Sequence, residues 1–238
     1  MTELAFGMLA FAMAGFVQGV AGFGSGIVVM ALLPKLWGVD AVVPLSALFS
    51  LILNAGLSWH LRAHCQRSEI GGLLLGGAFG VPLGVTFLAQ VDSALVTQIL
   101  GWVLLLFAVW RLSGAASPDR EISERWAPVA GLLSGLTAGA YNVGAPALLV
   151  YANGRRWERD PFRANLQTIF LILGILLIVS LLVAGLIDTT TLERFAYLAP
   201  AGAVGGLLGA GLAQKIPQAT FTRLILVLVM LMGISYLI

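Results

Sequence analysis

Long stretches without any charged residue dominate this sequence and restrict what it can fold into. Eight of them are 15 to 31 residues long, and the chain as a whole is 59% hydrophobic and only 10% charged. Soluble domains carry about 25% charged residues, whereas a helix that crosses a bilayer needs about 20 mostly apolar residues. We therefore expect an all-α integral membrane protein. The stretches are 4–34, 41–59, 70–91, 94–110, 126–154, 164–187, 195–214 and 224–238.

Two of these stretches are too long for one crossing. Stretch 4–34 has 31 residues and stretch 126–154 has 29, which as continuous helices would measure about 45 Å against a hydrocarbon core of about 30 Å. Both are rich in glycine in the middle, from Gly15 to Gly26 and from Gly131 to Gly144. Glycine and proline release the backbone from a helix, so we interpret each stretch as a re-entrant or broken helical hairpin.

The sequence also repeats itself. The pair Gly15 and Gly19 recurs 116 residues later as Gly131 and Gly135, and segment 77–84 resembles segment 202–209. This pattern predicts two membrane repeats, 1–112 and 126–238, joined by a linker at 113–125. Each repeat has one broken helical hairpin followed by three transmembrane helices.

The positive charges favour hairpins over single crossings. If each broken stretch crosses once, the 13 Lys and Arg residues divide six to seven between the two sides. If each stretch returns to its own side, the division is eleven to two, which agrees with the excess of Lys and Arg in cytoplasmic loops. The repeats are then inverted, the linker 113–125 is cytoplasmic, and both termini lie outside. The two glycine-rich tips should meet near the midplane, as in secondary transporters with discontinuous helices.

Several motifs carry a family resemblance. They are Gly19-Val-Ala-Gly22-Phe-Gly24-Ser25-Gly26, Ala41-Val-Val-Pro-Leu-Ser46, Gly144-Ala-Pro146 and Phe162-Arg163-Ala164. With them, nearly the whole chain resembles the sulfite exporter TauE/SafE family. The resemblance implies a multi-pass protein of a bacterial-type inner membrane that exports sulfite or a small organosulfonate. Its partners would be this small anion and the lipid bilayer, together with a second copy in a homodimer.

A helix that restarts after a break exposes free N–H groups and a positive dipole end, which suits an anion. We expect such restarts at Ile27 and Ala147. The predicted substrate-binding residues flank them or lie in nearby spans: Gly22, Phe23, Gly24, Ser25, Gly26, Ser46, Tyr141, Asn142, Gly144, Ala145, Pro146 and Asn165. Three further polar residues, Arg163, Gln18 and Gln167, are predicted to gate the access of the anion.

Two other glycine series have a structural interpretation. Gly72, Gly76, Gly80 and Gly84 recur every four residues, and Gly202, Gly205, Gly206 and Gly209 follow a similar pattern. Small residues at this spacing allow membrane helices to approach closely. We therefore expect helix packing, and not ligand binding, along both series.

The sequence excludes some functions and leaves others open. A net charge of +2 does not indicate a surface for nucleic acid, and one cysteine with two histidines makes a metal site or a cofactor site unexpected. No acidic residue lies well inside a predicted span, so an intramembrane enzyme acting on a lipid phosphate would lack an acid or base. We expect a transporter and not an enzyme, while such an enzyme, a passive anion channel or an accessory membrane subunit remain the alternatives.

Overall fold

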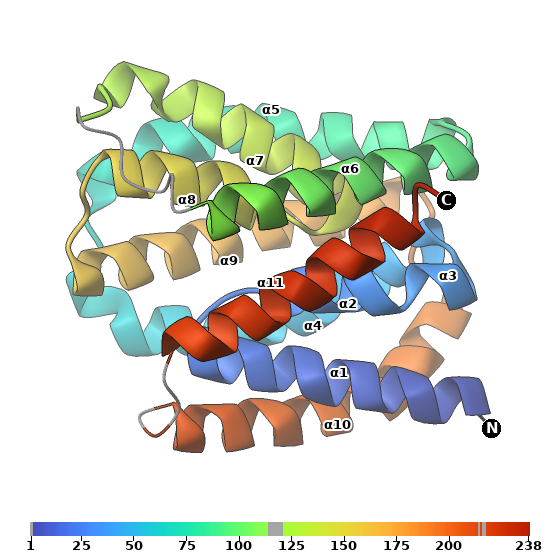
Figure 1. Ribbon diagram of the computed structural model, residues 1–238. Helices are drawn as coiled ribbons and strands as arrows, with labels where there is room; N and C mark the ends of the chain where they lie inside the picture. Colours follow the sequence, from blue (N-terminus) through green and yellow to red (C-terminus); the bar gives the residue numbers. More distant parts are fainter. Residues whose placement is uncertain (1, 114–120, 214, 216–217) are drawn as a thin grey trace.

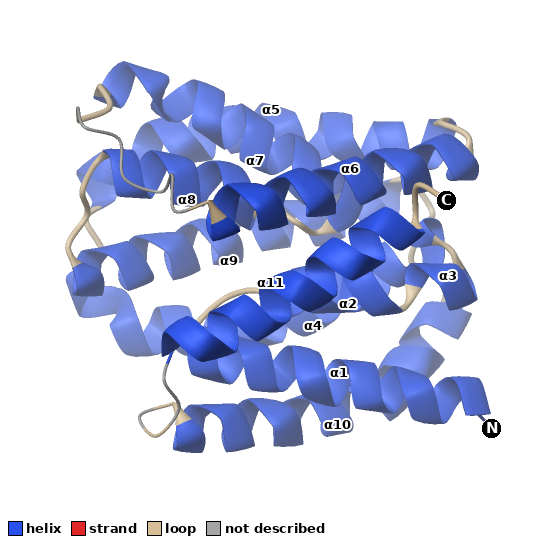
Figure 2. Cartoon of the chain, viewed as in Figure 1, coloured by secondary structure: helices blue, strands red, loops and turns tan. Residues whose placement is uncertain are grey.

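A computed structural model describes residues 2–113, 121–213, 215 and 218–238 (Figure 1). Within these ranges all regular structure is helical and no strand occurs (Figure 2), which confirms the all-α prediction. Six helices are long and apolar enough to cross a membrane, namely α1, α4, α5, α6, α9 and α10. The helices are α1 (Thr2–Ala21), α2 (Ser25–Leu32), α3 (Pro34–Trp37), α4 (Val39–Leu61), η1 (Arg62–His64), α5 (Arg67–Gln90), α6 (Ser93–Leu112), η2 (Glu124–Trp126), α7 (Ala127–Tyr141), α8 (Ala145–Gly154), α9 (Arg159–Val183), α10 (Thr189–Leu212) and α11 (Gln218–Ser235).

The first long stretch is divided between α1, α2 and α3. Helix α1 ends at Ala21, and α2 begins at Ser25 after Gly22 and Gly24, which adopt positive φ angles of 83° and 105°. Residues with a side chain rarely adopt such angles. The two ends of the stretch meet again, because Trp37 Nε1 donates a hydrogen bond of 3.4 Å to Glu3 Oε2. The stretch therefore forms a hairpin, with its first and last residues close together in space.

The second long stretch behaves in the same way. Helix α7 ends at Tyr141, the chain turns through Asn142 with a φ of 53°, and α8 begins at Ala145. The N–H of Ile122, just before this stretch, donates to the carbonyl of Gly154 at its end, at 2.9 Å. Both ends of this hairpin therefore also lie at one end of the helix bundle.

The breaks are shorter and lie elsewhere than the sequence suggests. Both return helices begin two residues earlier than expected, at Ser25 and Ala145 and not at Ile27 and Ala147. Gly15 and Gly19 remain inside α1, which with 20 residues is about 30 Å long by itself. These glycines stay helical because a neighbouring helix covers them. A Cβ on Gly15 would overlap the backbone of Gly202.

Backbone contact between helices confirms the packing role of the glycine series. Helix α5 packs on α7, and a Cβ on Gly76 would overlap the carbonyl group of Pro128. Helix α1 packs on α10, where a Cβ on Gly205 would overlap the carbonyl group of Ala12. Glycine is required at these positions because the two backbones touch directly.

The main helix pairs each combine one helix from the first half of the sequence with one from the second. Helix α1 of the first half packs on α10 of the second, while α7 of the second half packs on α5 of the first. Two further pairs, α4 with α9 and α6 with α11, join helices at equivalent positions in the halves. This is the pattern that a two-fold relation between repeats 1–112 and 126–238 would produce, and the inverted repeat stays a prediction. Residues 114–120 of the predicted linker 113–125 lie outside the described part of the chain.

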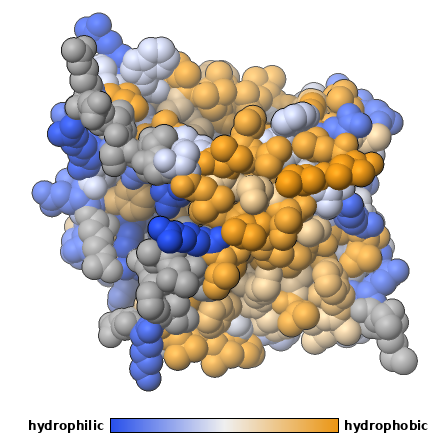
Figure 3. Space-filling model, viewed as in Figure 1, coloured by the Kyte–Doolittle hydropathy of each residue, from blue (hydrophilic) through white to orange (hydrophobic). Residues whose placement is uncertain are grey.

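Polar groups gather at the two ends of the bundle. Asp40, Asp188 and Arg194 line one hollow near Trp37, over whose ring the Arg194 guanidinium lies at 5.1 Å. At the opposite end, Arg155 bridges Glu69 at 3.0 Å and Glu121 at 2.9 Å. The face between them is largely apolar (Figure 3), as a surface in contact with lipid requires. Both chain termini lie at the first of these ends (Figure 1).

Candidate functional site

The two helix breaks touch each other in the interior of the bundle. A Cβ on Gly26, in the first turn of α2, would overlap the backbone carbonyl oxygen of Asn142. Asn142 is the residue at which α7 ends and the second break begins. Glycine at position 26 is thus required by the approach of the other hairpin.

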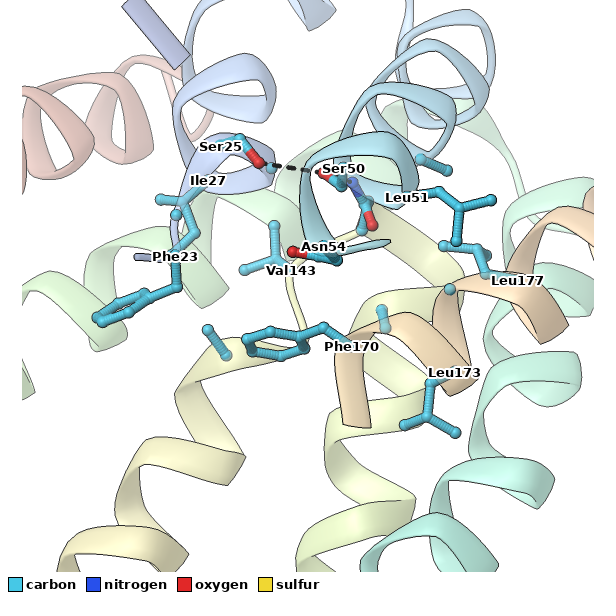
Figure 4. Close-up of a pocket in the computed structure, with 18 of the residues that line it drawn as sticks. Phe23, Ser25, Ile27, Ser50, Leu51, Asn54, Val143, Phe170, Leu173 and Leu177 are labelled. Carbon is cyan, nitrogen blue, oxygen red and sulfur yellow. Dashed lines mark hydrogen bonds between the residues drawn. The ribbon is translucent and has the colours of Figure 1, made fainter. Parts of the chain in front are cut away.

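A small cavity of about 60 Å³ opens where the breaks meet (Figure 4). One water molecule requires roughly 10–15 Å³, so this cavity has room for a small ion. In Figure 4, Ser25 and Ser50 lie on the opposite side of the cavity from Phe170 and Leu173. The lining residues are Gln18, Phe23, Gly24, Ser25, Gly26, Ile27, Ala47, Ser50, Leu51, Asn54, Ser134, Ala138, Asn142, Val143, Gly144, Ala145, Phe170, Leu173, Gly174 and Leu177.

Gln18 links α1 to the first break and to α4. Its Nε2 donates to Asn54 Oδ1 at 3.0 Å, and its Oε1 accepts from the N–H of Ser25 at 3.1 Å. Gln18 and Asn54 are both buried, with 3% and 6% of their surface exposed. Buried polar groups without partners are costly, so this pairing explains how apolar spans tolerate two amides.

Asn142 ties the second break to α4. Its Nδ2 donates to Ser46 Oγ at 2.8 Å and to Ser50 Oγ at 3.0 Å. The hydroxyl of Ser50 also lies 3.1 Å from that of Ser25. Both amide hydrogens of Asn142 are thereby used, and the serine hydroxyl groups connect the two breaks through one helix.

The helix ends offer backbone donors, although fewer than the sequence suggests. The first bond within α2 runs from the N–H of Val28 to the carbonyl of Gly24, which leaves the N–H groups of Gly26 and Ile27 without an acceptor in their own helix. In the second break, the N–H groups of Asn142 and Val143 donate to carbonyls of α7, and Pro146 has no N–H. The donors expected from 142–146 therefore reduce to those of Gly144 and Ala145.

Most of the predicted binding residues line the cavity. These are Phe23, Gly24, Ser25, Gly26, Asn142, Gly144 and Ala145, together with Gln18 from the predicted gate. Ser46 lies one hydrogen bond away, through Asn142. Gly22, Tyr141, Pro146, Asn165, Arg163 and Gln167 are not among the lining residues.

Two of those residues make contacts elsewhere in the bundle. The hydroxyl of Tyr141 donates to the carbonyl of Val96 in α6 at 3.0 Å. The Oδ1 of Asn165 accepts from the N–H of Gln66 at 2.8 Å, so this buried amide fixes the loop before α5.

Arg163 and Gln167 lie beside the first break on the side of α9. Gln167 Nε2 donates to the carbonyl of Gly22. A Cβ on Gly22 would lie 3.7 Å from Arg163 Nε. The exposed Arg163 therefore lies next to this break on the side of α9. A second cation, the partly exposed Arg111 of α6, lines a neighbouring hollow together with Phe23 and Gly24.

Three further polar residues line the cavity that were not among the predicted binding residues, namely Ser50, Asn54 and Ser134. Ser46, Ser50 and Asn54 follow one another at intervals of four, which places them on one face of a helix. Polar residues at this spacing inside an apolar span are the signal that could have identified them. Ser134 does not belong to such a series. Its hydroxyl donates to the carbonyl of Gly144 at 2.8 Å, a contact that the sequence alone does not indicate.

Comparisons with known proteins agree with this architecture. The sequence model of a family described as sulfite exporter TauE/SafE matches residues 7–236. The chain is similar to a protein of Comamonas testosteroni named "Probable inner membrane transporter protein TsaS", with 27% identity over 186 residues that cover 77% of this chain and 76% of that protein. No solved structure matches the chain.

Proposed function

Because the chain belongs to the sulfite exporter TauE/SafE family of membrane transporters, we propose that it exports a small sulfur-containing anion, such as sulfite or an organosulfonate. The observation that carries this proposal is the cavity between the two helix breaks, which neutral hydrogen-bonding groups line on one side. Donors without a carboxylate beside them suit an anion. An enzyme that acts on lipid phosphates would need an acid or base in this place.

In the proposal the anion binds between the breaks, near the midplane of the bilayer. Hydroxyl groups of Ser25 and Ser50 and the Nδ2 of Asn54 donate to it, together with the N–H groups that open α2. Asn142, which is bonded to Ser50, and Gly144 complete the lining on the side of the second break. Tyr141 and Asn165 hold the surrounding elements in place through their own hydrogen bonds.

Access from the cytoplasm passes the first break. Arg163 attracts anions to this entrance, and Gln167 closes it through its bond to Gly22. Gln18 occupies the N–H of Ser25 and must move before the anion can use that donor. An interior-negative membrane potential then expels a monovalent anion with about 2.3 kcal/mol per 100 mV.

The orientation has a native probe in Cys65, the single cysteine of the chain. It lies four residues before Glu69, at the end of the bundle opposite the termini, and is partly exposed. We expect the termini outside and this end in the cytoplasm, so a membrane-impermeant maleimide should label Cys65 only after lysis. If Cys65 is labelled to the same extent in intact and in lysed cells, this end of the bundle faces outside and the expected orientation is wrong.

Transport itself is tested in proteoliposomes loaded with sulfite. We expect the protein to release sulfite with a rate that saturates with its concentration and increases with an interior-negative potential. A rate that never saturates indicates a passive channel, and no release indicates an accessory subunit or an enzyme.

Asn54→Leu, which removes one cavity donor without changing the volume greatly, should lower the rate of sulfite release at least about tenfold, since a hydrogen bond to a charged group contributes roughly 1.5–3 kcal/mol.

A further inference from the structure

We propose that the cavity selects monovalent anions over divalent ones, so that a diprotic acid is transported in its singly charged form. The inference rests on the proposed function and concerns the same site. It follows from the charges, the dipoles and the walls of the cavity.

No residue that lines the cavity carries a formal charge. Two arginines lie outside it near the first break: Arg163, beyond Gly22, is exposed, and Arg111 lines a neighbouring hollow and is partly exposed, so water reduces the field of both at the cavity. Arginine balances the charge of an oxyanion through charge-assisted, often bidentate, hydrogen bonds. This cavity has no arginine among its lining residues.

The fixed positive charge at the cavity comes from helix ends. Helices α2 and α8 both begin there, at Ser25 and Ala145. Each helix N-terminus is equivalent to roughly +0.5 elementary charge, so that two supply at most roughly one, and the C-terminal ends of α1 and α7 at the same breaks reduce this amount. The helix ends therefore leave a second negative charge without compensation.

The opposite wall makes a second charge costly. Phe170, Leu173 and Leu177 of α9 line it and cannot solvate an ion. The cost of moving an ion out of water grows with the square of its charge, so a dianion loses about four times as much solvation as a monoanion of the same size. The neutral donors of Ser25, Ser50 and Asn54 do not restore that difference.

A protonated oxyanion also finds an acceptor for its own hydrogen. The amide oxygens of Gln18 and Asn54 belong to cavity-lining residues, and each accepts one bond within the protein. A carbonyl oxygen has two lone pairs, so each can accept a second bond from the O–H of a ligand. The cavity is thus complementary to an ion that has one charge and one O–H group, such as hydrogen sulfite.

Isothermal titration calorimetry at constant ionic strength tests this inference on the unmodified protein. The ligands are methanesulfonate, which is monovalent at all working pH values, sulfate, which is divalent, and sulfite, which changes its charge near neutral pH. We expect methanesulfonate to bind equally at mildly acidic and mildly alkaline pH. Sulfate should bind at least about tenfold more weakly than methanesulfonate, and sulfite should bind more tightly at the acidic pH.

The outcomes separate the inference from the function on which it rests. Sulfate binding as tight as that of methanesulfonate, or sulfite binding that does not change with pH, overturns the selection for single charge and leaves the anion site standing. If neither methanesulfonate nor sulfite binds at either pH, the proposed anion site itself is wrong.

Discussion

Replacing Asn142 with aspartate is expected to abolish anion binding while the protein still folds. Asparagine and aspartate have nearly the same shape, and both tolerate the left-handed conformation that Asn142 adopts at φ 53°. The change places a negative charge in the cavity and removes the donor to Ser46 and Ser50. Two like charges about 4 Å apart repel by roughly 4 kcal/mol at an effective dielectric constant near 20, which corresponds to roughly a thousandfold weaker binding.

The measurement is titration with methanesulfonate beside the melting temperature of the unliganded protein. Asn153→Asp is the matched control, because Asn153 lies in the last turn of α8 and away from the cavity, and it should bind as the wild type does. Burial favours the neutral form of a carboxyl group, so the Asn142→Asp variant should regain part of its binding at acidic pH. Unchanged affinity in this variant at neutral pH means that the anion does not bind between the breaks.

Gly76→Val is expected to cause a large loss of stability. A Cβ at this position would overlap the carbonyl group of Pro128, and a clash with backbone cannot be relieved by a change of rotamer. Helices α5 and α7 would have to separate, and overpacking of this kind costs roughly 1–3 kcal/mol, occasionally more. The fraction of protein that elutes as a folded, monodisperse species in detergent should fall sharply, together with its melting temperature.

Gly71→Val gives the matched control in the same helix. Gly71 lies five residues earlier in α5, and no heavy atom lies within 4 Å of the position of its Cβ. The same side chain should therefore have little effect there. Equal behaviour of the two variants would show that direct backbone contact between α5 and α7 does not stabilise the protein.

The long elements of this fold could be predicted from charge alone, because a helix in lipid must exclude charges over a fixed length. Stretches 70–91 and 94–110 correspond to α5 and α6 within a few residues. The extent of the breaks could not be predicted in the same way. Gly15 and Gly19 look like helix breakers in sequence, yet a partner helix 187 residues further along, at Gly202 and Gly206, keeps them helical.

The meeting of the two glycine-rich tips could also be expected, while the side chains around them could not. Tyr141 and Asn142 are neighbours in sequence, but α7 ends at Tyr141 and Asn142 adopts a left-handed conformation, so their side chains point in different directions. Tyr141 consequently contacts α6, and Asn142 contacts α4. Ser50 and Asn54 join the site because α4 crosses both breaks, and this crossing depends on packing between distant segments.

The exchange of helices between halves has a consequence for biosynthesis. Ala12 in α1 packs against Gly205 in α10, 193 residues later, which the ribosome adds roughly 10–40 s after Ala12 at 5–20 residues per second. Helix α7, by contrast, finds α5 already synthesised when it appears, since Pro128 follows Gly76 by only 52 residues. The glycine face of α1 must therefore wait in the membrane without its partner, and a chain that stops before α10 leaves that face open to other proteins or to degradation. The helix made first is stable only when one of the last has been inserted.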